Sequence, residues 1–165
     1  MRAILTYHSI DGSGSPISVS PSTFRAHVRW LASGSVRVLP LDRLLQADDR
    51  EDAVAITFDD GFENFATEGA ALLAEHGLPS TVFVVPDHVA GTNAWGGRSA
   101  PGIPTLPLMS WPTLARMAQM GVTLGAHTRR HRDLTRVRGA ALEDEVAGCV
   151  ERMAVETGRR PSSFA

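Results

Sequence analysis

The fold of this chain is set by Ala53-Val54-Ala55-Ile56-Thr57-Phe58, a segment followed directly by Asp59-Asp60-Gly61. An unbroken apolar run of this length is typical of a β-strand buried on both faces, as strands are in a parallel sheet covered by helices. The two carboxylates and the glycine come where such a strand must end and the chain must turn. The segment is therefore predicted to be a central strand that brings polar side chains to one edge of a sheet.

Short β-rich runs alternate with helical patterns on both sides of this strand. Further strands are predicted at residues 3–7, 36–39, 81–85 and 122–126, and another begins at Phe164. Helices are predicted at residues 21–33, 41–47, 63–76, 111–120 and 139–157, and residues 86–107, rich in Gly and Pro, are predicted to be a long structureless loop. This alternation implies an α/β domain with parallel strands, either an open doubly wound sheet or a barrel. In both, chemistry gathers at the carboxyl ends of the strands.

The composition excludes several classes of protein. All 16 basic residues are Arg, so the chain has no lysine for a Schiff base or for a Walker-type phosphate loop. The net charge of −2 gives no reason to expect a nucleic-acid partner. The single cysteine, Cys149, is expected to be a buried thiol in a helix. No apolar run is long enough to span a membrane, and the N-terminus lacks a signal-peptide pattern. As written, the chain is expected to be cytoplasmic.

Reactive side chains follow two of the predicted strands. Asp59 and Asp60 follow the central strand, and His127 and His131 follow the strand at 122–126. The histidines are four residues apart, so on one helical turn they would share a face and a metal ion. Alone, the carboxylates read as a turn with a helix cap and the histidines as a polar surface turn. Together, two imidazoles and one carboxylate form a divalent-metal site, and the second carboxylate is left as a base.

Three segments of the chain resemble the polysaccharide deacetylases, also called carbohydrate esterase family four or the NodB homology domain. They are Ile4-Leu5-Thr6-Tyr7-His8-Ser9-Ile10, Ile56-Thr57-Phe58-Asp59-Asp60-Gly61, and residues 124–134, which contain His127-Thr128-Arg129-Arg130-His131. The resemblance runs from the first strand to the last residue, and it implies a distorted (β/α) barrel over residues 1–165.

The same resemblance implies a role for each motif residue. Asp59 would be the general base that takes a proton from the attacking water. Asp60, His127 and His131 would hold a divalent metal ion, usually zinc. The reaction would remove an N-acetyl group, less often an O-acetyl group, from a sugar unit of a glycan and release acetate.

Family members continue past Phe164-Ala165. An aromatic-Pro-x-Gly turn that helps stabilise the oxyanion, an Arg-bearing segment that orients the base and a Leu-x-His motif with the catalytic acid are expected there. The chain is therefore expected to be the N-terminal portion of a catalytic domain, incomplete at its C-terminus, with reduced turnover. An open sheet edge at Phe164-Ala165 predicts self-association.

Two alternatives remain open. The chain can be a non-catalytic glycan-binding or scaffold remnant of a deacetylase, which would bind sugar without releasing acetate. It can also be a non-haem Fe(II) oxygenase with a facial triad of two histidines and one carboxylate, although this leaves Asp59 without a role.

Two further residues are candidates for substrate binding. His8 ends the first strand and is expected to face the same rim, with a purely structural role as the alternative. Trp95 lies in the long loop with Asn93 and Arg98 and is expected either to stack on a pyranose ring or to be a mobile loop tip. A cluster of arginines beside the site is predicted to be a solvated helix face offset by Glu143, Asp144 and Glu145 or, alternatively, a contact for an anionic glycan. The cluster comprises Arg129, Arg130, Arg132, Arg136 and Arg138.

Overall fold

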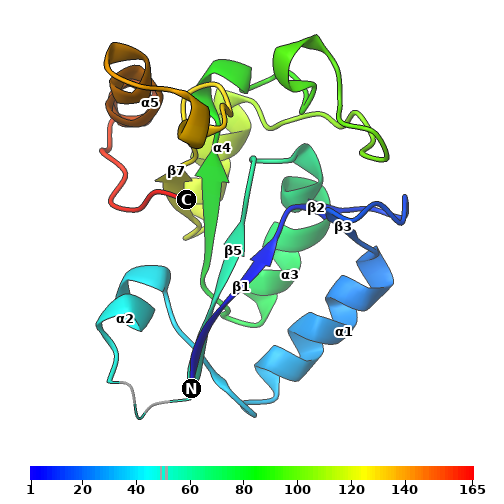
Figure 1. Ribbon diagram of the computed structural model, residues 1–165. Helices are drawn as coiled ribbons and strands as arrows, with labels where there is room; N and C mark the ends of the chain where they lie inside the picture. Colours follow the sequence, from blue (N-terminus) through cyan, green and yellow to red (C-terminus); the bar gives the residue numbers. More distant parts are fainter. Residues whose placement is uncertain (49, 51) are drawn as a thin grey trace.

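A computed structural model of the chain describes residues 1–48, 50 and 52–165 (Figure 1). Its centre is a parallel sheet in the order β1-β5-β6-β7, in which β4 also pairs with β5. The strands are β1 (Arg2–Tyr7), β4 (Arg37–Val38), β5 (Ala53–Phe58), β6 (Ser80–Val84) and β7 (Thr123–Ala126). A separate pair, β2 (Ser9–Ile10) and β3 (Ser18–Val19), extends from the end of β1. The predicted α/β class with a parallel sheet is confirmed.

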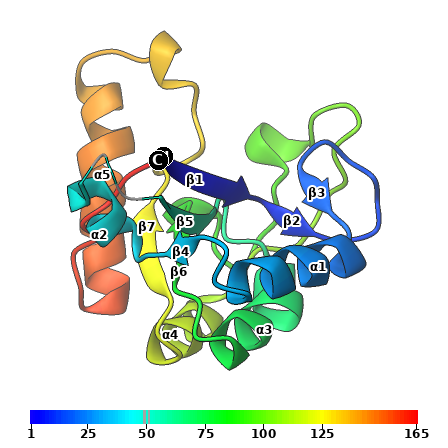
Figure 2. The same ribbon diagram turned by 90° about the horizontal axis from the view of Figure 1, so that it is seen from below.

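The described residues form five α-helices, which flank the strands on two sides (Figure 2). They are α1 (Pro21–Ala32), α2 (Leu41–Gln46), α3 (Ala70–Glu75), α4 (Trp111–Gln119) and α5 (Ala140–Thr157). Ser20 and Ser110 cap α1 and α4 by accepting hydrogen bonds from the backbone N–H groups of Thr23 and Thr113. Gly158, with a φ of 68°, ends α5 in the left-handed conformation that favours glycine.

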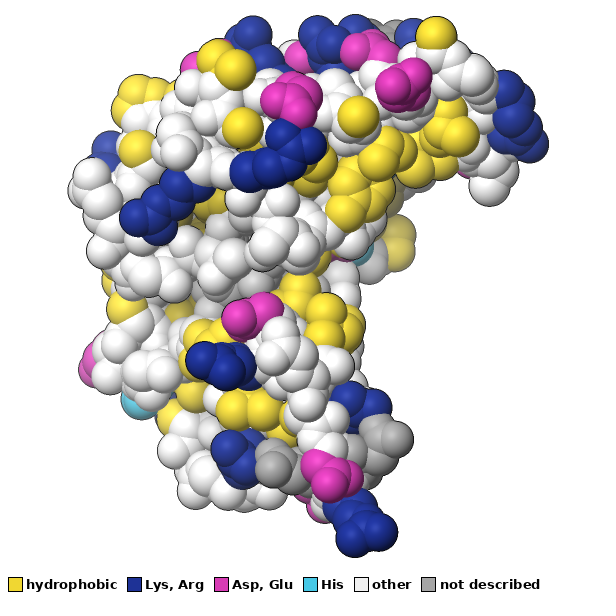
Figure 3. Space-filling view, turned by 90° about the vertical axis from the view of Figure 1, so that its left-hand side faces the viewer, with side chains coloured by type: hydrophobic (Ala, Val, Ile, Leu, Met, Phe, Trp, Pro, Cys, Tyr) yellow, Lys and Arg dark blue, Asp and Glu magenta, His cyan; other side chains and the backbone are white. Residues whose placement is uncertain are grey.

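All six residues of β5 are buried, because both faces of this strand are covered. Val54, Ile56 and Phe58 belong to the main hydrophobic cluster, which also includes side chains of α1, α3, α4 and α5. Ala53 and Ala55 face a smaller cluster formed with α2 and Phe83. Figure 3 shows that the side of the molecule that carries α2 and α5 is hollowed and that hydrophobic side chains gather in the hollow. The continuous apolar run thus correctly predicted a strand covered on both sides.

The sheet does not form a closed ring within the described residues. β1 and β7 stand at the two ends of the order, and no ladder of described residues joins them. The strand predicted to begin at Phe164 is present as a parallel bridge between Ala126 and Phe164. The Ala126 N–H donates to the carbonyl of Ser163 over 3.0 Å, and the Ala165 N–H donates to the carbonyl of Ala126 over 3.1 Å. Self-association through an open sheet edge stays a prediction.

Two segments differ from expectation. The predicted helix at 63–76 contains a π-helical turn, Phe65–Gly69, before α3 begins; a single π turn within a helix is a common local irregularity. The loop at 86–107 is not structureless. Its buried Asn93 donates to the carbonyl of Pro104 over 3.0 Å and accepts from the N–H of Leu106 over 2.8 Å. An amide side chain can pair with a backbone donor and a backbone acceptor at the same time. The two bonds of Asn93 therefore tie the beginning of the loop to its end.

Cys149 is buried in α5, and its burial raises the pKa of the thiol to about 11, which leaves it unreactive at neutral pH. Among the helices of the described residues, none combines the length and the apolar character needed to cross a membrane.

Gly125 in β7 is predicted to be a sensitive position. A Cβ atom there would lie 2.5 Å from ring atoms of Phe83, which is closer than packed side chains allow. Gly125→Ala is expected to lower the free energy of unfolding by about 1–3 kcal/mol, the usual cost of overpacking a core. Urea denaturation of the metal-free protein measures it. Gly12→Ala, where a Cβ would meet nothing within 4 Å, is the control; equal stability of the two variants would contradict the prediction.

Candidate metal centre

The carboxyl ends of β5 and β7 bring the two predicted motifs together. The Asp59 N–H still donates to the carbonyl of Tyr7 in β1 over 2.9 Å, so Asp59 continues the strand pairing. The chain then reverses at Asp60 and Gly61, whose φ values are 69° and 76°. A non-glycine residue in this left-handed region is held there by its surroundings. The turn buries the Asp60 carboxylate and directs it toward the end of β7.

Asp60, His127 and His131 converge on one point. Asp60 Oδ1 lies 3.5 Å from His127 Nε2 and 3.2 Å from His131 Nε2. One ligand atom from each residue lies within 4.8 Å of the other two. Tetrahedral zinc with ligands at 2.0–2.2 Å would hold neighbouring ligand atoms roughly 3.3 Å apart. Asp60 Oδ1 is also buried and has no hydrogen-bond partner, which is costly unless a cation or donor satisfies it. The donor set and its spacing therefore fit a divalent metal ion.

A hydrogen bond at the ring nitrogen that does not face Asp60 fixes the orientation of His127. Its Nδ1 lies 2.8 Å from the carbonyl oxygen of Ala165. A carbonyl oxygen can only accept, so Nδ1 carries the proton and Nε2 presents a free lone pair. Histidine ligands of metal ions are commonly held by such a bond. Ala165 is a partner that the motif itself did not reveal.

The two histidines do not share a helical turn, so that expectation is wrong. Residues 127–131 form an irregular loop in which Thr128 and His131 both have φ values of 57°. The His127 N–H donates to the carbonyl of Val84 over 3.0 Å, which keeps this residue in register with the sheet. The loop must therefore reverse sharply to return His131 to the same point, and the spacing of four residues serves a tight loop instead of a helix.

Trp95 packs on the candidate ligand His131. The two rings are stacked with centroids 4.3 Å apart and planes inclined by 19°. The His88 ring stands perpendicular to Trp95, with ring centroids 4.8 Å apart. Trp95 lies in the short 3₁₀ turn Trp95–Gly97 of the long loop. One face of the indole is therefore occupied by an imidazole, and only its remaining surface is free to meet a sugar. This contact could not be read from the sequence, because the two residues lie in different loops.

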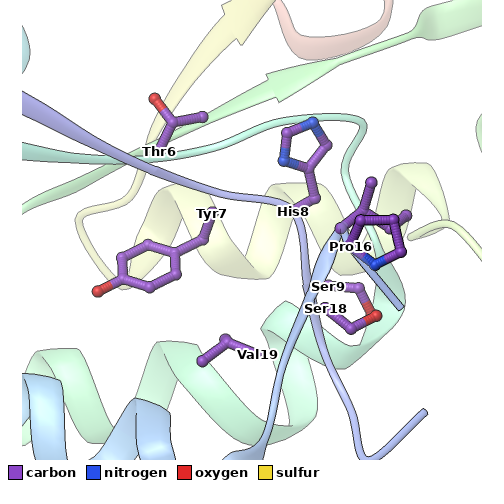
Figure 4. Close-up of a pocket in the computed structure, with 8 residues that line it drawn as sticks. Thr6, Tyr7, His8, Ser9, Pro16, Ser18 and Val19 are labelled. Carbon is purple, nitrogen blue, oxygen red and sulfur yellow. The ribbon is translucent and has the colours of Figure 1, made fainter. Parts of the chain in front are cut away.

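Asp59 lies beside the three candidate ligands, and Asp59 Oδ1 is buried without a hydrogen-bond partner. His8 Nε2 is 3.9 Å from Asp59 Oδ2, so His8 does face the rim as predicted. Figure 4 shows His8 and Thr6 pointing to the same side of β1, next to a pocket of about 140 Å³ that Ser9 and Ser18 also line. Burial raises the pKa of Asp59 above the usual carboxyl value, although His127 and His8 oppose the shift. A carboxyl with a raised pKa is a stronger proton acceptor once it is ionised.

The raised pKa of Asp59 predicts a pH-dependent stability difference in the metal-free protein. Folding favours the neutral carboxyl, so the stabilising contribution is complete below the unfolded pKa of about 3.9 and is lost as the pH rises through the higher folded value. Asp59→Asn is expected to raise the Tm in chelator-treated protein at pH 8, and this gain should shrink toward pH 4. Thermal unfolding across this pH range measures the difference; a lower Tm for the variant at pH 8 would contradict it.

The arginine cluster is paired internally near the loop. Arg129 Nε lies 3.0 Å from Asp87 Oδ2, and Arg130 Nε lies 3.2 Å from the same oxygen. Both guanidinium groups also contact Asp144, and their hydrogen bonds hold the pKa of this carboxyl below its usual range. Arg132 and Arg136 pair with Glu145 and Asp133. Asp144 and Glu145 therefore offset the cluster as predicted, and Asp87 and Asp133 do so as well.

Glu145 is the residue of this region that sequence reasoning undervalued, because it was counted only as an offsetting charge. Its side chain is fully buried. A signal was present in the spacing. Glu145, Cys149 and Met153 follow one another at intervals of four residues, and they are the buried residues of α5. A charged residue on an apolar helical stripe is a mark of a specific internal partner.

Comparison with known proteins identifies the family. The family profile described as polysaccharide deacetylase matches residues 46–165, a range that includes the carboxylates and both histidines of the site. The chain belongs to the polysaccharide deacetylase family, as its motifs predicted.

Individual relatives agree with this assignment. YxkH of Bacillus subtilis (strain 168), whose name places it among the polysaccharide deacetylases, is 26% identical over 149 residues, which cover 87% of this chain and 48% of YxkH. The chain thus spans about half the length of this curated relative. IcaB from Ammonifex degensii superposes with a TM-score of 0.76 at 20% identity, over 99% of this chain and 72% of IcaB. The Streptococcus pyogenes deacetylase PplD, solved in complex with acetate, gives 0.78 at 17% identity, over 98% of this chain and 71% of PplD. These structures share the fold.

Proposed function

We propose that residues 1–165 form the N-terminal portion of the catalytic domain of a metal-dependent deacetylase that removes N-acetyl groups from a glycan. The observation that carries the proposal is the convergence of Asp60, His127 and His131 beside the separate buried carboxylate of Asp59. Membership of the polysaccharide deacetylase family supports this substrate class. The relative PplD was solved with acetate, the acid that such a reaction would release.

In this proposal Asp60 Oδ1, His127 Nε2 and His131 Nε2 would hold the metal ion, most simply zinc. A bound zinc ion supplies a Lewis acid and lowers the pKa of a coordinated water. Asp59 accepts the proton of the water that adds to the acetyl carbonyl carbon. The bond between that carbon and nitrogen then breaks as the proton held by Asp59 passes to the nitrogen, so acetate leaves and the amine stays on the sugar. The raised pKa of Asp59 suits this task, because a general base works best when its pKa is close to the operating pH.

Substrate contacts are proposed for His8 and Trp95. The position of His8, 3.9 Å from Asp59, supports a role in orienting the base or in meeting a sugar hydroxyl. Trp95 borders the ligand His131, so the surface of the indole that faces away from this imidazole is proposed to meet the sugar ring.

The test is metal content combined with acetate release by the purified chain. We expect about one zinc ion per chain and acetate release from N-acetylated glucosamine oligomers that chelation abolishes. Zinc and sugar binding without acetate release on a panel of acetylated sugars would favour the non-catalytic remnant. Iron at equal content together with oxoacid-dependent oxygen uptake would favour the oxygenase, and a chain without bound metal would overturn the proposal.

A further inference from the structure

The loop between the two candidate ligands needs outside support. Thr128 and His131 both occupy the left-handed region, and neither is glycine. Such residues persist only when the surrounding structure fixes them. The metal-ligating role of His131 depends on this conformation, because the loop leaves β7 at His127 and must double back over four residues.

Both backbone N–H groups at the centre of the loop are bound by one residue of α5. The Arg130 N–H donates to Glu145 Oε2 over 2.8 Å, and the Arg129 N–H donates to the backbone carbonyl of Glu145 over 3.0 Å. The other carboxylate oxygen, Oε1, lies 3.2 Å from a guanidinium nitrogen of Arg130 and 3.6 Å from Arg132 Nε. Glu145 therefore binds the main chain of the loop through two hydrogen bonds, and the arginine side chains neutralise its buried charge.

The neighbouring acidic residues act differently. Asp144 contacts the guanidinium groups of Arg129 and Arg130 and no backbone donor of the loop. Asp87 pairs with the same two guanidinium groups, and its own backbone N–H donates to the carbonyl of Arg129 over 3.2 Å. Glu145 is the carboxylate among these three that accepts a hydrogen bond from the loop backbone. An apolar side chain at position 145 would cost less desolvation energy than a buried carboxylate. The role of Glu145 is therefore to fix the loop conformation and not to add stability.

We propose that Glu145 is a positioning residue that sets metal affinity by holding the 127–131 loop in its ligating conformation. The proposal rests on the metal centre of the proposed function. Replacing a residue that holds a metal ligand in its binding orientation typically lowers metal affinity by about 10–100-fold. Glu145→Ala is therefore expected to weaken zinc binding by about 10–100-fold. Glu145→Gln, which keeps an oxygen for the Arg130 N–H, is expected to recover part of that loss.

The experiment is a chelator competition titration of zinc on the full chain, with circular dichroism to confirm that each variant is folded. Asp144→Asn, which weakens pairs to the same arginines, is expected to change zinc affinity by less than threefold. Glu143→Gln, an exposed neighbour on α5, is expected to change nothing. A role in fold stability alone predicts a lower Tm for Glu145→Ala with unchanged zinc affinity, and that result would overturn the proposal.

A second measurement needs no variant. In the unsubstituted, metal-free chain the Arg130 amide is expected to exchange with solvent at least about tenfold more slowly than the amides of the exposed Gly12 and Gly14. Equal exchange rates would overturn the anchoring by Glu145. Failure of the proposed function would look different, since the unsubstituted chain would then bind no zinc, or would bind it without weakening by His127→Ala.

Discussion

Asp59→Asn is expected to lower the rate of acetate release by at least about 10²–10⁴-fold while the chain keeps its zinc. The amide has the size of the carboxylate but cannot accept a proton, so the variant removes general-base catalysis, which is worth about that factor. Metal binding should survive, because Asp59 is not among the three residues whose ligand atoms converge. Acetate release and zinc content are measured on the same preparation.

The matched control for this prediction is Asp42→Asn. Asp42 is an exposed carboxylate in the first turn of α2, so its replacement should leave both the rate and the zinc content unchanged. Retained activity in Asp59→Asn would contradict the assignment of the base. Loss of zinc together with activity would make Asp59 a ligand instead.

His131→Ala is expected to lower zinc affinity by more than about 100-fold. Replacing a residue that only orients a ligand lowers metal affinity by up to about 100-fold, so replacing the ligand itself should lower it further. The fold should persist, because His131 is part of a surface loop and not of the hydrophobic clusters. The measurement is zinc competition with a chelator, supported by a thermal melt of the metal-free protein.

His76→Ala is the control for the histidine series, since His76 is exposed at the end of α3 and should leave zinc affinity unchanged. If His131→Ala and His76→Ala bound zinc equally well, the candidate centre would be refuted. The series also separates a ligand from its support, because His131→Ala should weaken zinc binding more than Glu145→Ala does.

The sequence was most informative where one pattern decided one property. The apolar run at 53–58 predicted a strand buried on both faces, and the structure buries all six residues. The carboxylates and histidines were expected at the carboxyl ends of two strands of one α/β domain, and the parallel order β5-β6-β7 places both at the same edge of the sheet. In these cases the information is local. A strand buried on both faces is a continuous run of apolar residues, and a chain reversal contains glycine or aspartate.

The parts that were missed depend on contacts between distant segments. The stacking of Trp95 on His131 and the hydrogen bond from Arg130 to Glu145 join residues whose proximity no local pattern encodes. The helical reading of His127 and His131 was wrong because spacing fixes only how far apart two residues can lie. The sheet hydrogen bond of His127 and the grip of Glu145 on the loop decide the actual path.

Parallel pairing around β5 also governs how the chain reaches this structure. Each partner strand is joined to β5 through a crossover. Pairing Arg2 with Ala53, or Ile56 with Ser80, therefore closes a long loop, and the chain loses conformational entropy before the new contacts stabilise it. Refolding should therefore be slower than that of a helical bundle of equal length. Until β1 and β6 dock, the bare β5 segment offers two unpaired apolar edges to other chains. Dilute protein at low temperature is the condition under which this chain should refold with the least aggregation.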